Sequence, residues 1–106
     1  MGMFEIREYT ERGYSPFADW HNGLDPVTAA RVDTYIRRLE FGNFGAAKPL
    51  RGGVSELRLD FGAGYRVYYG LDGKTVVILL GGGDKRRQRA DIEAAVRRWE
   101  SYKKGE

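Results

Sequence analysis

The sequence predicts a two-layer α+β domain with the element order β-α-α-β-β-β-α. Two proline-marked helix starts in the first half and a change to period-two apolar spacing after Val54 support this class. The chain has 106 residues, 42% of them hydrophobic, which suffices for one small core. We therefore expect residues 1–106 to form one domain, an antiparallel sheet with an N-terminal helical hairpin and a C-terminal helix.

The first half is expected to hold one strand and two helices. Apolar and charged residues alternate over residues 3–9, as in a half-buried strand. Ser15-Pro16 predicts a short helix to about Asn22-Gly23, because serine caps helices and proline suits the first turn. Asp25-Pro26 repeats the signal for a longer helix that Gly42-Asn43 ends. The core-facing stripe of this second helix is Ala29, Val32, Ile36 and Leu39.

The second half is expected to form a three-stranded meander and a final helix. The strands are predicted at Glu56–Asp60, Tyr65–Leu71 and Thr75–Leu80, with turns at residues 62–64 and at Asp72-Gly73. The strand over residues 4–9 should lie beside Val76–Leu80. Residues 81–83, three glycines, are expected to break the sheet before Asp84 or a neighbour caps the last helix. The apolar stripe of that helix is Ile92, Ala95, Val96, Trp99 and Tyr102.

Composition excludes several function classes. There is no cysteine and only one histidine, His21, so disulfides, thiolate zinc sites and multi-histidine metal clusters are ruled out. No apolar run approaches the roughly 20 residues of a membrane span. We expect a soluble cytoplasmic domain without metal, cofactor or membrane contact. Residues 1–50 hold six Lys/Arg and seven Asp/Glu, whereas residues 51–106 hold twelve and eight, and this basic second half indicates an anionic partner, nucleic acid first.

The sheet face away from the hairpin is expected to be open and to carry the function. Arg58 and Arg66 should face each other there across two strands, which is unfavourable unless an anion lies between them. Either Glu56 or Asp60 neutralises the pair internally, or the arginines form a phosphate clamp. Tyr68 shares this face and could stack on a base.

The glycine-rich segment before the last helix could extend this basic face. Lys85, Arg86 and Gln88 follow it, but the order of residues is not that of a nucleotide-binding P-loop. The alternative is a solvated helix start with Arg87–Asp91 and Arg89–Glu93 pairs.

Five motifs occur in an order and spacing that resemble a known family. They are Gly42-Asn43-Phe44-Gly45, Lys48-Pro49-Leu50, Gly53-Val54-Ser55-Glu56-Leu57-Arg58, Gly64-Tyr65-Arg66-Val67-Tyr68-Tyr69 and Gly82-Gly83-Asp84-Lys85 with Gln88 and Asp91-Ile92. Together they resemble the phage-derived addiction-module killer proteins, the HigB-like branch of the RelE/ParE toxin superfamily. The resemblance covers Phe4 to about Trp99 and implies a RelE-like fold.

The resemblance implies the toxin of a type II toxin–antitoxin system, held by a helix-turn-helix antitoxin. It implies an mRNA endonuclease (mRNA interferase) that acts on the ribosome, inhibits translation and uses the RNA 2′-hydroxyl without a metal. Arg58, Arg66 and Lys85 or Arg86 would act on the scissile phosphate, Glu56 or Asp91 could be the base, and Tyr68, Gln88 and Lys48 would contact RNA. Two alternatives are a ParE-like DNA gyrase inhibitor that acts by protein binding and a toxin-like fold that has lost activity.

Overall fold

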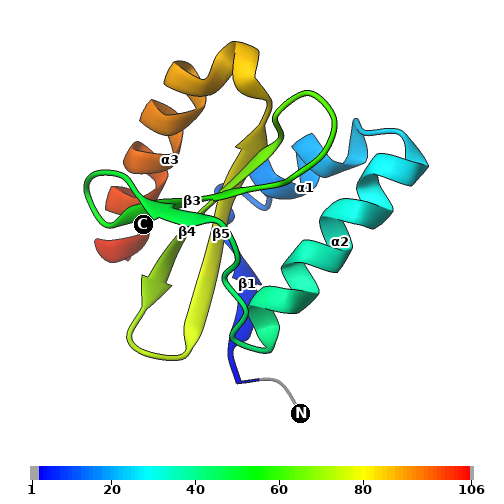
Figure 1. Cartoon of the computed structure of the whole chain (residues 1–106). Coiled ribbons are helices and arrows are strands. Elements are labelled where there is room, and N and C mark those ends of the chain that lie inside the picture. The colour runs from blue at the N-terminus through cyan, green and yellow to red at the C-terminus, as the bar shows by residue number, and fades with distance from the viewer. Residues whose placement is uncertain (1–2, 106) are drawn as a thin grey trace.

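A computed structural model describes residues 3–105 as a five-stranded mixed sheet with helices on both faces (Figure 1). The strand order is β1-β5-β4-β3-β2, with β1 parallel to β5 and the other pairs antiparallel. The elements are β1 (Glu5–Glu8), α1 (Pro16–Asn22), α2 (Pro26–Glu40), β2 (Ala47–Pro49), β3 (Val54–Arg58), β4 (Arg66–Asp72), β5 (Val76–Gly83), a 3-10 turn (Lys85–Arg87) and α3 (Gln88–Lys103). No described helix is long and apolar enough to cross a membrane.

Both N-terminal helices begin where the sequence predicts. The Ser15 hydroxyl accepts a hydrogen bond of 3.0 Å from the backbone N–H of Ala18, and an Asp25 carboxylate oxygen accepts one of 3.1 Å from Thr28. Each cap satisfies a backbone donor that the first helical turn leaves free. The two prolines occupy first-turn positions, which need no such donor.

The predicted register of the sheet is confirmed. Leu57 and Leu59 are 2% and 4% exposed and belong to the core beneath α1 and α2, together with Val32 and Leu39. β1 lies beside β5 as expected, with Glu5 opposite Val76. Burying each of these aliphatic side chains contributes about 1.5–3 kcal/mol, so a one-residue slip of β3 would be costly.

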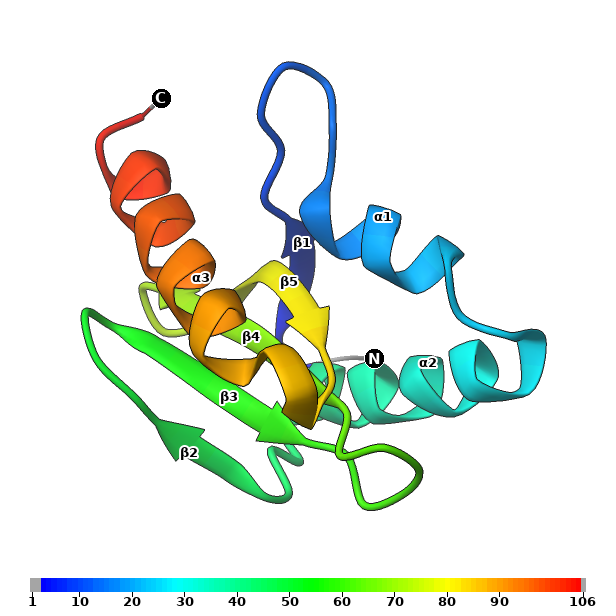
Figure 2. The ribbon, with the colours of Figure 1, turned by 90° about the horizontal axis from the view of Figure 1, so that it is seen from above.

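The expectation of a two-layer domain with an open sheet face is wrong. Figure 2 shows α3 on the face of the sheet opposite to α1 and α2. Ala95 and Trp99 of α3 pack there against Val54, Tyr68 and Ile78 and form a second core. The stripe predicted on the last helix therefore covers the face that was expected to be free.

The expected element order also lacks one strand. β2 is a three-residue edge strand that pairs with β3, and Pro49 near its end limits its hydrogen bonding. Its residues lack the alternation that marks longer strands, so the pattern gave no signal.

The three glycines at residues 81–83 do not break the sheet, because β5 continues through them. A Cβ atom on Gly82 would collide with the Trp20 ring, so glycine allows α1 to pack directly on the strand. β1 has ended by then, opposite Leu79. The glycines therefore serve close packing and not a phosphate-binding turn. Asp84 follows but caps the 3-10 turn and not α3, with its carboxylate accepting from the Arg86 N–H at 2.9 Å. α3 begins after Arg87, which makes no side-chain capping hydrogen bond, so the predicted cap lies one turn before the last helix.

Candidate functional site

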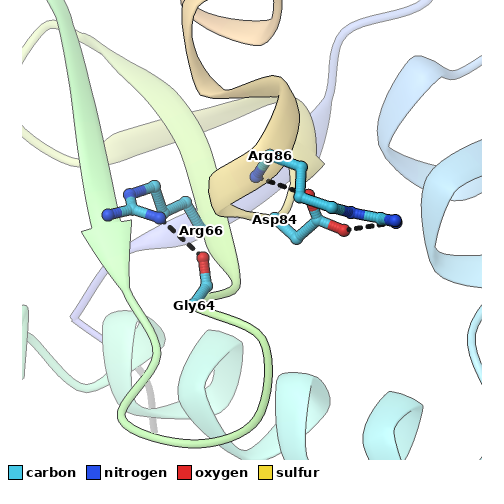
Figure 3. A network of polar contacts seen from close by, with 4 residues as sticks. All are labelled: Gly64, Arg66, Asp84 and Arg86. Carbon is cyan, nitrogen blue, oxygen red and sulfur yellow. Dashed lines mark hydrogen bonds and ion pairs between the residues drawn. The ribbon is translucent and has the colours of Figure 1, made fainter.

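Arg58 and Arg66 are direct cross-strand neighbours at the ends of β3 and β4 that meet at the residue 59–65 loop. Arg58 is exposed, whereas Arg66 is only 7% exposed. The Arg66 Nη1 donates a hydrogen bond of 2.7 Å to the carbonyl of Gly64, which fixes the direction of the guanidinium (Figure 3). The pairing of the two arginines was predicted, but the burial of Arg66 was not.

Glu56 lies two residues before Arg58 on β3, opposite Tyr68 of β4, and is 2% exposed. Its Oε1 atom is 3.5 Å from Arg66 Nε and also accepts from Gln88 Nε2 at 3.5 Å. Glu56 thus neutralises Arg66 internally, as one of the two sequence-based alternatives stated. Asp60 does not take part; it is exposed, and its backbone N–H donates to the Tyr35 hydroxyl.

The Arg66 Nε is nevertheless unsatisfied. Within residues 3–105 it has no hydrogen-bond partner of good geometry, although it is buried. The Nε atom is itself too buried to reach a ligand, and it lies 3.5 Å from Glu56 Oε1. The Nη2 atom of Arg66 makes no hydrogen bond within the described residues and is not among the buried atoms, so it can donate to a further oxygen ligand.

Tyr68 corrects the sequence-based interpretation of this face. It is the cross-strand neighbour of Glu56, but α3 covers it completely and its exposed fraction is 0%. Burial, reinforced by the charges of Glu56 and Asp91, raises the pKa of the Tyr68 hydroxyl far above its ordinary value. A ring with no exposed surface cannot stack on a base, so the expected RNA contact of Tyr68 is wrong.

Of the two basic candidates after β5, the structure brings only Lys85 to Arg66. The Lys85 N–H donates to the carbonyl of Ala63 at 3.3 Å, which docks the 59–65 loop on the 3-10 turn. The space beside the Cα of Gly64 is bordered by both Lys85 Cβ and Arg66 Nη1. Lys85 is exposed and is therefore accessible to a ligand of Arg66.

Arg86 points away from Arg66 (Figure 3). Its guanidinium pairs with Asp84 at 3.2 Å, so its charge is partly compensated within the chain. The expectation that Arg86 could share the phosphate with Arg66 is not met by this geometry.

Asp91 also lies apart from the arginine pair. It sits in the first turn of α3 over Gly83 and lines a cavity of about 300 Å³ with Trp20 and Arg98. Burial raises the pKa of its carboxyl, while Arg87 and Arg98 oppose the shift. Asp91 and Arg66 form no ion pair in the described part of the chain. Asp91 is therefore a poor candidate for a base acting at Arg66.

The remaining predicted contacts border Glu56. Lys48 is exposed on β2 as the cross-strand neighbour of Glu56, and Gln88 is half-buried at the start of α3. His21 is elsewhere and pairs with Asp33 at 2.8 Å. We define the Arg66 site as Glu56, Arg58, Arg66, Lys85 and Gln88.

Two residues next to the Arg66 site were missed by sequence reasoning. Arg51 and Arg89 line a groove of about 450 Å³ together with Gln88, Ile92 and Glu93. The expected Arg89–Glu93 and Arg87–Asp91 ion pairs are absent among residues 3–105. The sequence signal that could have identified Arg51 is its position directly before the Gly52-Gly53 turn.

No group of three potential metal-ligating side chains occurs among residues 3–105.

The fold has a known counterpart. A double mutant of the Escherichia coli toxin RelE, solved in the free state, superposes with a TM-score of 0.65, covering 92% of this chain and 98% of that one at 23% sequence identity. The chain thus has a RelE-like fold.

Sequence comparison defines the family. The model of the phage-derived Gp49-like family (DUF891) matches residues 19–100, and the chain belongs to this family. An uncharacterized protein of Haemophilus influenzae is 46% identical over 80 residues, which make up 74% of this chain and 81% of that protein.

Proposed function

We propose that this protein is the toxin of a type II toxin–antitoxin pair and that it cleaves mRNA on the ribosome. The family and the RelE-like fold support the toxin class, and the five sequence motifs favour the HigB-like branch. Its partners would be a helix-turn-helix antitoxin, mRNA and the ribosome, in the cytoplasm.

The observation that carries the proposal is the ordered, largely buried guanidinium of Arg66, whose Nη2 has no partner within residues 3–105, beside two exposed cations. Arg66 is held by Gly64 and Glu56, while Arg58 and Lys85 are free of ion pairs within residues 3–105. A preorganised cationic group stabilises developing phosphate charge without reordering, and arginine presents a planar fork to two phosphate oxygens.

The chemistry that suits these groups is attack of the RNA 2′-hydroxyl on the adjacent phosphorus. The 2′-oxygen forms a bond to phosphorus, the 5′-oxygen leaves with a proton, and the products carry a 2′,3′-cyclic phosphate and a 5′-hydroxyl. Arg66, Arg58 and Lys85 would stabilise the extra negative charge, so the reaction needs no metal. RNA carries its own nucleophile, and the protein contributes orientation and charge.

The structure supports a positioning role for Glu56 better than the role of base. Its carboxylate is almost fully buried and is committed to Arg66 and Gln88. Arginine cannot accept a proton near neutral pH. We therefore assign proton transfer to groups outside this chain, on the ribosome or the RNA. A group supplied by the ribosome would make cleavage ribosome-dependent.

The test is induction in growing cells of the wild type and of Arg58→Ala/Lys85→Ala. Both residues are exposed, so the double variant should fold, and Arg37→Ala on α2 is the matched control. We expect the wild type and the control to stop methionine incorporation before thymidine incorporation, and the double variant to stop neither. Thymidine incorporation failing first, with intact mRNA, would favour the gyrase-binding alternative.

A further inference from the structure

The groove beside the Arg66 site has the chemistry of a nucleotide site. It lies between the β2–β3 turn and the start of α3, and its volume of about 450 Å³ suits one nucleoside. Gln88 is shared by the groove and the Arg66 site, since it lines the groove and donates a hydrogen bond to Glu56. A ligand in the groove would therefore lie next to whatever Arg66 contacts.

The wall of the groove is positioned by backbone contacts. The turn before β3 closes with a hydrogen bond of 3.1 Å from Val54 N–H to the Arg51 carbonyl. Gly53 in this turn has φ +88°, and a Cβ there would lie 2.6 Å from Trp99 Nε1. Glycine thus lets the turn seat directly on α3, which holds Arg51 opposite the helix.

The charges in the groove are arranged for a nucleotide and not for a bare anion. Arg51 and Arg89 are exposed and form no ion pair within the described residues. Ile92 adds an apolar surface. Glu93 would repel a phosphate, but a carboxylate accepts hydrogen bonds from the exocyclic amino groups of adenine, cytosine and guanine.

We propose that this groove binds the RNA nucleotide adjoining the scissile phosphate, with Arg51 and Arg89 on its phosphate or base face and Glu93 on a base amino group. The inference rests on the proposed function and deepens it, because it assigns one subsite and the path of the strand along α3. Arginine side chains suit both tasks, since they bind phosphate and stack on bases.

The first test is RNA binding by the full-length protein. The probe is a fluorescent single-stranded oligonucleotide of mixed sequence with 2′-O-methyl groups, which blocks cleavage. We expect Arg51→Ala/Arg89→Ala to raise the Kd about tenfold. The slope of the logarithm of the binding constant against the logarithm of the salt concentration should become shallower by about 0.7 for each phosphate that the variant no longer neutralises. Arg37→Ala/Arg97→Ala, which removes two exposed arginines outside the groove, should bind within twofold of the wild type.

The second test is cleavage-site selection on programmed ribosomes. We expect the wild type to disfavour uridine, which has no exocyclic amino group, at one position flanking the cut. Glu93→Ala should lose this preference while the ends of the products stay the same.

If the double arginine variant binds and cleaves RNA like the wild type, the groove is not an RNA subsite, although the proposed function stands. If that variant instead loses only antitoxin binding, the groove belongs to the antitoxin and the inference is wrong. A wild type that binds the oligonucleotide through these arginines but never cleaves mRNA would overturn the proposed function and would leave the groove as an RNA-binding site with no scissile phosphate beside it.

Discussion

Arg66 combines two properties that a surface arginine rarely has. Its side chain is 8% exposed, and it is directed by a carbonyl on one side and a carboxylate on the other. An exposed arginine must be ordered when it binds phosphate, which costs side-chain entropy, whereas this guanidinium is ordered in advance.

Arg66→Lys should therefore lower the cleavage rate by on the order of 10²-fold, because lysine keeps the charge but lacks the planar fork. Arg37→Lys, the same change on the exposed surface of α2, should leave the rate unchanged. The measurement is the initial rate of mRNA cleavage on programmed ribosomes, with circular dichroism to verify folding. Equal rates for Arg66→Lys and wild type would show that the fork is not used.

Stability should also depend on the buried pair. Glu56 pairs with Arg66 in the interior, and the two side chains are 3% and 8% exposed. Removing one partner of a buried pair leaves an unpaired charge, so Arg66→Ala should lower the free energy of unfolding by about 3 kcal/mol. Arg66→Ala/Glu56→Gln should recover at least about 1 kcal/mol in urea unfolding, because the orphaned charge is gone. A double variant that is less stable than Arg66→Ala would contradict this explanation.

At the scale of elements, β5 depends on the absence of a side chain at Gly82. A Cβ atom there would overlap the Trp20 ring, although the backbone angle itself suits any residue. Gly82→Ala should therefore destabilise the protein by about 1–3 kcal/mol through overpacking and push α1 off the strand.

Gly23→Ala is the matched control, since its Cβ would meet nothing closer than 3.5 Å and its φ is −86°. Urea unfolding monitored by tryptophan fluorescence reports stability, and the folded-state emission reports the packing around Trp20 and Trp99 together. Similar unfolding free energies for the two variants would show that α1 moves without cost.

Elements with local signals were predictable, and those defined by tertiary packing were not. The caps Ser15 and Asp25 determine helix starts through bonds within one turn, and alternation in β3 sets its register. β2 is defined by its neighbour β3, and the glycines of β5 by the side chains that pack on them. The same limit applies to the site: spacing placed Arg58 opposite Arg66, but only the position of α3 decides that Tyr68 is buried.

The whole molecule is an α/β/α sandwich in which one sheet separates two cores. Tyr68 lies in the core under α3, and its hydroxyl has no hydrogen-bond partner within residues 3–105. Because unfolding exposes Tyr68 to water, the pH dependence of the free energy of unfolding should report on the ionisation of this hydroxyl.

The raised pKa of Tyr68 predicts alkaline destabilisation. The folded state favours the protonated hydroxyl, so this contribution to stability is complete below the ordinary tyrosine pKa of about 10 and is lost as the pH rises above it. Above pH 10 the wild type should lose stability more steeply than Tyr68→Phe, which cannot ionise there. At pH 7 the two should differ by less than about 1 kcal/mol, because the hydroxyl makes no hydrogen bond. Parallel stability curves from pH 7 to 11 would contradict the assignment.

The central claim is that the Arg66 site cleaves mRNA by attack of the 2′-hydroxyl. The most direct measurement adds the purified protein to ribosomes translating a defined mRNA, in the presence of the Mg²⁺ that ribosomes need, and identifies both new RNA ends. A matched mRNA carries a single 2′-deoxy nucleotide immediately 5′ of the mapped cut. We expect a 2′,3′-cyclic phosphate and a 5′-hydroxyl on the normal mRNA, and no cut at the deoxy position. A 5′-phosphate end, or cleavage after the deoxy nucleotide, would contradict the mechanism.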